Sequence, residues 1–331
     1  MSRRFYINSN GRLRRKDNTV YFEVENNGKI ERKVLPVEDI DAIYIFGEVD
    51  FNTKVLNYLS QYDIPIHIFN YYGYYSGTYL PRRKNVSGIL VIEQVKHYIE
   101  NQKRLYLAIS FIEGAVHHIL RNLRKNELDK TLYTDIEKEL FPKVFEANSI
   151  EELMAIEGNI RDRYYQLFNE IIQNEDFYME KREKRPPSNP INALISFGNA
   201  IMYSTALTEI YRTQLDPTVS YLHAPQEKRF SLSLDLAEIF KPFIIDPLIF
   251  SLIRTKQITI KDFDKDLNFA YLNEKGRKKF LKAYEERLAK TVKHRKLKRK
   301  VSYRQFIRLE CYKLIKHLIG DDIYIPFKAW W

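Results

Sequence analysis

Cysteine is almost absent from this sequence of 331 residues, which contains only Cys311. A single thiol cannot form an internal disulfide or a cysteine metal cluster, so we expect a protein of the reducing cytoplasm. No apolar run approaches the ~18 residues of a membrane helix, and the first residues, MSRRFYINSNGRLRRKD, contain no hydrophobic signal core. We therefore expect neither a membrane segment nor secretion. The sequence also lacks internal repeats and low-complexity tracts.

Acidic residues are fewer than basic ones, and the imbalance is local. The chain carries a net charge of +11, yet residues 276–316 alone hold 16 Lys and Arg against 3 Glu, an excess of +13. The centre of this segment, KTVKHRKLKRKVSYRQFIR, interleaves basic residues with Tyr303 and Phe306. Such a patch is typical of proteins that bind a polyanion through salt-sensitive phosphate contacts. A solvated helix face or a flexible basic tail is the alternative interpretation.

The residue pattern changes from strands to helices near residue 84. Short β-branched or aromatic runs occupy residues 5–7, 19–24, 42–46 and 64–69, and Asn10-Gly11 and Asn27-Gly28 are hairpin signals. After PRRK at residues 81–84, amphipathic helical segments begin near residues 89, 134, 149, 189, 229, 273 and 302. We predict an α+β protein with an N-terminal β-sandwich-like domain, residues 1–84, followed by a larger all-α domain, residues 85–331.

Two carboxylates and a histidine are concentrated in residues 215–242, LDPTVSYLHAPQEKRFSLSLDLAEIFKP. Asp235 and Glu238 are three residues apart, so on a helix they project from the same side. His223 follows a turn that contains proline and has room to lie beside them. Such a set suits a divalent cation that works on phosphate. An Asp-x-x-Glu pair on a solvated helix face and a histidine without a ligand are the alternatives.

A third carboxylate, Glu157, falls on the apolar stripe of a helix predicted to begin at Ser149, where Glu152 completes a capping-box pattern. A buried carboxylate costs several kcal/mol unless it is paired, protonated or bound to a metal. Glu157 is therefore a candidate metal ligand. An ion pair with Arg161, one turn further along the helix, is the alternative explanation.

A site with two or three carboxylates and one imidazole is rich in oxygen and suits Mg²⁺ or Mn²⁺. The imidazole favours Mn²⁺, whereas Zn²⁺ is less favoured because no cysteine contributes. With water as the nucleophile, such a site cleaves DNA. With a DNA 3′-hydroxyl as the nucleophile, it transfers a strand.

Three segments occur in an order that resembles one protein family. They read AIEGNIRDRYY, KREKRPPSNPINALISFGNAIMY and LDPTVSYLHAP followed by SLSLDLAEIFKP. Together they resemble the CRISPR adaptation integrase, the CRISPR-associated protein one family. The similarity extends over about residues 35–290, through LPVEDIDAIYIFGEVDFNT, IPIHIFNYYGYYSG, GILVIEQVKHY and LNEKGRKKFLKAYEERL.

The resemblance implies that Glu157, His223 and Glu238 are catalytic metal ligands, and that Asp235 is the accompanying catalytic carboxylate. Three positions depart from the family pattern, and none of them is a ligand. Gln214 and Ser220 replace glycines that are common around the His turn, and Lys241 replaces an arginine that usually precedes proline. We expect Lys241 to contact DNA, together with Arg295, Lys298, Arg299 and Lys300 of the basic segment.

The resemblance also implies the reaction and the partners. The family inserts short foreign DNA fragments, as spacers, into a CRISPR array by 3′-hydroxyl attack, and it has metal-dependent nuclease activity. We therefore expect double-stranded DNA partners, namely the spacer fragment and the CRISPR repeat. We also expect a homodimer formed through the β-domain and a companion, CRISPR-associated protein two. Two other functions compete: a metal-dependent nuclease of DNA repair, and a non-catalytic basic protein that binds nucleic acid.

Overall fold

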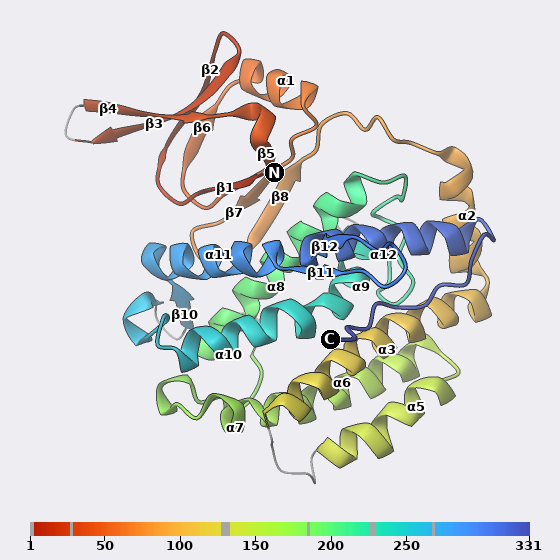
Figure 1. Cartoon of the computed structure of the whole chain (residues 1–331). Helices are drawn as coiled ribbons and strands as arrows, with labels where there is room; N and C mark the ends of the chain where they lie inside the picture. Colours follow the sequence, from red (N-terminus) through yellow and green to blue (C-terminus); the bar gives the residue numbers. More distant parts are fainter. Residues whose placement is uncertain (1–2, 27–28, 127–132, 184–185, 226–229, 267–268) are drawn as a thin grey trace. The chain divides into compact units, whose positions relative to one another are not determined.

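The computed structural model describes residues 3–26, 29–126, 133–183, 186–225, 230–266 and 269–331. The chain forms two compact units, Met1–Lys84 and Asn85–Trp331, and each is described by itself. Strands dominate the first unit and helices the second, which confirms the predicted α+β class (Figure 1). No helix in the described ranges has the length and apolar character needed to cross a membrane.

The first unit is built from two four-stranded sheets. One sheet has the order β1-β5-β7-β8 and the other the order β4-β3-β2-β6. The strands are β1 (Arg3–Ile7), β2 (Gly11–Lys16), β3 (Thr19–Asn26), β4 (Lys29–Leu35), β5 (Ile40–Ile45), β6 (Val49–Phe51), β7 (Ile66–Phe69) and β8 (Tyr75–Tyr79). Alternate apolar residues of both sheets share one buried core with helix α1 (Thr53–Gln61).

Two local predictions for this unit were wrong. Helix α1 was not expected, and Asn10-Gly11 does not form a hairpin. Strand β1 pairs in parallel with β5, whereas β2 pairs antiparallel with β3 in the other sheet, so the chain changes sheet at this dipeptide. A Cβ at Gly11 would lie 2.3 Å from the Glu23 carbonyl oxygen. This close approach of the backbone, and not a hairpin turn, explains why position 11 is a glycine. Asn27-Gly28 lies outside the described residues, and the flanking strands β3 and β4 pair antiparallel.

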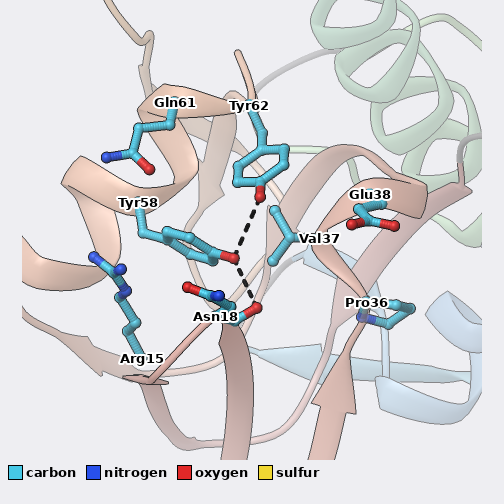
Figure 2. Close-up of a pocket in the computed structure, with 8 residues that line it drawn as sticks. All are labelled: Arg15, Asn18, Pro36, Val37, Glu38, Tyr58, Gln61 and Tyr62. Carbon is cyan, nitrogen blue, oxygen red and sulfur yellow. Dashed lines mark hydrogen bonds between the residues drawn. The ribbon is translucent and has the colours of Figure 1, made fainter.

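A cavity of ≈ 320 Å³ opens in the first unit (Figure 2). It is lined by Arg15, Asn18, Pro36, Val37, Glu38, Tyr58, Gln61 and Tyr62. The Tyr58 hydroxyl donates to the Asn18 carbonyl at 2.7 Å, and the Arg15 guanidinium lies 4.2 Å from the centre of the Tyr58 ring. None of the site residues predicted from the sequence lines this cavity.

The second unit is mainly helical, as predicted, but it is not all-α, because it also contains two short pairs of antiparallel strands. Its helices are α2 (Gly88–Ile99), α3 (Asn101–Lys125), α5 (Phe141–Glu146), α6 (Ile150–Gln166), α7 (Phe168–Ile172), α8 (Pro190–Tyr211), α9 (Ser231–Phe240), α10 (Asp246–Arg254), α11 (Glu274–Ala289) and α12 (Tyr303–Leu318). Strands β9 (Phe263–Asp266) and β10 (Phe269–Leu272) form one pair, and β11 (Thr291–Lys293) and β12 (Lys300–Ser302) form the other. One π-helical segment, Asp135–Leu140, precedes α5, and another, Lys241–Ile245, follows α9.

Polar N-caps set several helix starts where the sequence predicts them. Ser149, Asn189, Asn273 and Ser302 each accept a backbone hydrogen bond at the start of α6, α8, α11 and α12. A helical segment is present near Thr134, as predicted, but the expected cap by the Thr134 side chain is not. Its own backbone is helical and its side chain caps nothing at the start of the π-helical segment.

Helix α8 forms the centre of the second unit because it is apolar and buried around almost its whole circumference. Helix α9 packs against α8 and α3, while α6 packs against α3. The helices that carry the predicted carboxylates are thereby fixed to a common scaffold.

Burial of His67 makes a prediction for the pH dependence of stability. Burial, assisted by the charge of Arg4, lowers the pKa of His67 to about 3, while its Nδ1 lies 2.7 Å from the Thr78 hydroxyl. Below pH ~6.5 the unfolded chain binds a proton that the folded chain excludes, so stability falls as pH falls. Between pH 7 and 5, urea denaturation of the wild type should lose up to ~2 kcal/mol more than that of His67→Gln. Equal losses would contradict the assignment.

Candidate active site

Arg161 brings together two carboxylates that lie on different helices. On α6, its Nε donates to Oε1 of Glu157 at 2.9 Å, and its Nη2 donates to Oε2 of Glu238 on α9 at 2.7 Å. The side chains of Arg161 and Glu238 are 10% and 8% exposed, whereas that of Glu157 is 26% exposed. The Glu157–Arg161 ion pair that the sequence left open therefore exists. It does not exclude a site, because the same guanidinium also holds Glu238.

A second cation, Lys241, contacts Glu238 from the π-helical segment that follows α9. Its Nζ donates to Glu238 Oε1 at 2.5 Å and lies 4.7 Å from the centre of the Tyr203 ring of α8. Burial raises the pKa of Glu238, but the charges of Lys241 and Arg161 outweigh burial and lower it to about 2. Glu238 is therefore ionised at neutral pH. Because Lys241 is itself buried, its expected contact with DNA stays a prediction.

Asp235, one turn before Glu238, has both oxygens occupied by hydrogen bonds. Its Oδ2 accepts from the backbone N–H groups of Tyr221 and Leu222 at 2.7 and 3.0 Å. Its Oδ1 accepts from the backbone N–H of His223 at 3.0 Å and lies 2.8 Å from His223 Nδ1. The side chain is fully buried. A carboxylate engaged in this way positions the His turn and has little capacity left for a metal.

The same contact orients the imidazole of His223. An Nδ1–H that donates to Asp235 leaves Nε2 with a lone pair, which is the form that binds a metal ion. Burial lowers the pKa of His223, but the hydrogen bond and charge of Asp235 outweigh burial and raise it. The side chain remains 27% exposed, so a ligand can reach it.

Groups that the sequence did not single out hold the His turn from α2 and α3. Gln94 Oε1 accepts from the Asp216 backbone N–H at 2.7 Å, and its Nε2 donates to the Asp216 carbonyl at 3.1 Å. Arg104 Nε donates to the Tyr221 carbonyl at 2.9 Å. Ser220, one of the departures from the family pattern, donates to the His223 carbonyl at 2.6 Å. This hydrogen bond links the two ends of the segment Ser220–His223.

The donor set fits a divalent cation in its chemistry, since it offers two carboxylates and one imidazole. In this arrangement the two carboxylates are held by Arg161 and Lys241. Among the described residues, no three His, Cys, Asp or Glu side chains are gathered closely enough to share one ion. A metal that uses these donors must therefore compete with the two cations for Glu157 and Glu238.

Sequence reasoning also missed Asp246, the first residue of α10. Its carboxylate is buried and close enough to Tyr164 and Arg161 to interact electrostatically with both. Burial raises the pKa of Asp246 to about 6. Its Oδ2 has no hydrogen-bond partner within the described part of the chain. The detectable signal was an acid inside an apolar run, KPFIIDPLIF, like the one that drew attention to Glu157.

The centre of the basic segment forms a hairpin between helices α11 and α12, which hold the rest of the segment. Strands β11 and β12 pair antiparallel, and Arg295, Lys298, Arg299 and Lys300 are exposed in its turn and on its second strand. The Arg295 guanidinium lies 5.2 Å from the centre of the Trp330 ring. Over the described ranges no carboxylate lies within salt-bridge distance of these four side chains, so their charge faces solvent.

Comparison with known proteins gives a consistent result. The chain matches the family described as CRISPR associated protein Cas1 over residues 5–286. It is 56% identical to a CRISPR-associated endonuclease Cas1 of Thermodesulfovibrio yellowstonii, over 99% of this chain and 100% of that protein. A CAS1 protein from Thermotoga maritima has a similar structure, with a TM-score of 0.90 and 42% identity, over 97% of this chain and 99% of that one. A casposase bound to an integration product shares the fold, with a TM-score of 0.88 and 21% identity, over 99% and 94%.

The role of Asp235 can be tested through the histidine that it positions. Asp235→Asn removes the charge that stabilises the protonated imidazole, so the pKa of His223 should fall. We expect nuclease activity to fall by about 10–100-fold as well, the loss typical of a metal site whose histidine loses its orienting carboxylate. An NMR titration of the His223 ring, with Asp216→Asn as the control in the same turn, measures the first effect. A His223 pKa equal to that of wild type would contradict the role of Asp235.

Proposed function

The chain belongs to the CRISPR-associated Cas1 family, and from this premise we propose that Glu157, His223 and Glu238 form its catalytic metal site. The protein is an endonuclease that acts in CRISPR spacer integration. The observation that carries the proposed site is the bridge that Arg161 makes between Glu157 and Glu238. Asp235 lies one helical turn before Glu238 on the same helix, α9, and contacts His223 of the turn that precedes this helix.

Enzymes of this family are metal-dependent. We propose Mg²⁺ or Mn²⁺ as the metal, held by the oxygens of Glu157 and Glu238 and by Nε2 of His223. When bound, such an ion polarises a phosphodiester and stabilises the negative charge that builds on its oxygens. The protein prepares the donors: Glu238 is ionised at neutral pH, and Asp235 holds the imidazole with Nε2 free.

Strand transfer and cleavage use the same site with different nucleophiles. A 3′-hydroxyl at the end of a spacer fragment gives integration into the CRISPR repeat, whereas water gives cleavage. We propose that the exposed hairpin residues Arg295, Lys298, Arg299 and Lys300 contact DNA phosphates, because they carry unpaired charge beside an aromatic group. We further propose homodimerisation through the β-domain, residues 1–84, and the companion CRISPR-associated protein two as a partner.

The integrase function is tested with a 3′-OH oligonucleotide, a supercoiled plasmid that bears the repeat, Mn²⁺ and the companion protein. Wild type should join the strands, and EDTA should abolish joining. His223→Ala should reduce joining by at least about 100-fold, in the range of catalytic-group losses. Glu274→Ala, which breaks an exposed ion pair with Lys278, is the control and should join normally. Nicking without joining would favour the repair nuclease, and equal joining by wild type and His223→Ala would exclude the site.

The DNA contact of the hairpin is tested by its dependence on salt. Replacing Lys298, Arg299 and Lys300 with Gln should weaken duplex binding and reduce the slope of log K against log [salt], by up to ~0.9 for each phosphate that is no longer neutralised. Fluorescence anisotropy between low and moderate salt measures the slope. A matched control replaces Lys84, Lys96 and Lys103, each paired with a carboxylate, and removes the same charge. An identical slope for both triple variants would refute contact by the hairpin.

A further inference from the structure

The proposed metal site already contains two buried positive charges. Arg161 and Lys241 both donate to Glu238, and Arg161 also donates to Glu157. The two cations therefore occupy the carboxylate oxygens that a divalent ion would use. Both oxygens of Glu238 are engaged, Oε1 by the lysine and Oε2 by the arginine, and Oε1 of Glu157 accepts from the same arginine.

A divalent ion cannot simply be added to this arrangement. It would place two further positive charges close to Arg161 and Lys241 in a site of low exposure, where like charges repel strongly. At least one cation must therefore leave its carboxylate as the ion enters. Lys241 is the more mobile candidate, because its single contact with Glu238 comes from a flexible stem, whereas Arg161 holds two carboxylates at once.

Arg161 has a further negative group within electrostatic range. Asp246 is buried, and its carboxylate interacts electrostatically with Arg161 and with the Tyr164 hydroxyl. Tyr164 is itself fixed by Asn122, whose Nδ2 donates to the tyrosine oxygen at 2.9 Å and to the Pro242 carbonyl at 2.7 Å. Since Oδ2 of Asp246 accepts no hydrogen bond from any described residue, this carboxylate has capacity for a cation.

From these contacts we propose that Lys241 and Arg161 hold the metal-ligand carboxylates in the metal-free protein, and that a divalent ion binds by displacing Lys241 from Glu238. Asp246 then remains as the counter-charge of Arg161. This proposal rests on the proposed metal site. It assigns to Lys241, Arg161 and Asp246 a positioning role that determines the affinity for the metal. Stacking over Tyr203 keeps the displaced ammonium close to the site.

The test measures binding of Mn²⁺ to the full chain without DNA, by the loss of the free-ion signal in electron paramagnetic resonance. Lys241→Met keeps an apolar stem of similar length and removes the competing charge. It should bind Mn²⁺ at least about tenfold more tightly than wild type, while the metal-free protein melts at a lower temperature. Asp246→Asn removes the counter-charge of Arg161 and should weaken Mn²⁺ binding by about tenfold.

Lys279→Met is the matched control. Lys279 donates to both oxygens of the buried Asp262 carboxylate at 2.7 Å, so this variant breaks a comparable ion pair that includes none of the site residues. Its affinity for Mn²⁺ should stay within twofold of wild type. Should Lys241→Met fold poorly by circular dichroism, Lys241→Gln tests the same charge with a polar stem.

The outcomes separate the two proposals. Mn²⁺ binding that survives unchanged in both Glu157→Ala and Glu238→Ala places the ion elsewhere. That result would contradict both the proposed metal site and the displacement of Lys241. If Mn²⁺ binding requires Glu238 but the affinity of Lys241→Met is equal to or weaker than that of wild type, the metal site stands. The displacement of Lys241 is then contradicted. Binding that requires Glu238 and becomes tighter only in the Lys241 variants supports both.

Discussion

The constraint on which the site depends is that helix α9 buries two carboxylates one turn apart. A buried carboxylate costs several kcal/mol unless it is hydrogen-bonded or paired. The protein meets this cost in two different ways. Asp235 is satisfied by backbone N–H groups and an imidazole, which fold the His turn around it. Glu238 is satisfied by two cations, one of which ties α9 to α6. Loop position and helix docking therefore both follow from the charges on one helix.

Much of this arrangement was predictable from the sequence. The change from strands to helices follows from residue periodicity, and the starts of α6 and α12 follow from polar caps. The spacing of Asp235 and Glu238 was enough to place them on one helical face. Glu157 was detectable because a carboxylate on an apolar stripe requires a partner. These are local properties, and local patterns report them well.

What was missed depends on contacts distant in sequence. The Arg161–Glu238 pair spans 77 positions, and no local pattern indicates that one arginine serves two glutamates. The pairing of β1 with β5, which turns Asn10-Gly11 into a crossing between sheets, is likewise set by the shared core. Asp246 resembled one more acid in an apolar run, and its meaning comes from Tyr164 and Arg161. The β11–β12 hairpin has strands of only three residues, and half of residues 291–302 are Lys or Arg, so neither a period of two nor one of 3.6 marked it.

The two groups of cations in the second unit differ in their surroundings, and this difference separates their functions. Charges on the exposed hairpin are screened by salt over a Debye length of about 8–10 Å, so they attract a polyanion without fixing its geometry. Arg161 and Lys241 are shielded from solvent, and each is held to a carboxylate at hydrogen-bonding distance. The two groups of cations could not take over each other's function. Buried lysines cannot gather DNA from solution, and a mobile surface lysine cannot hold Glu238 in place. The distribution of charge, more than its net value of +11, therefore determines what this protein can do.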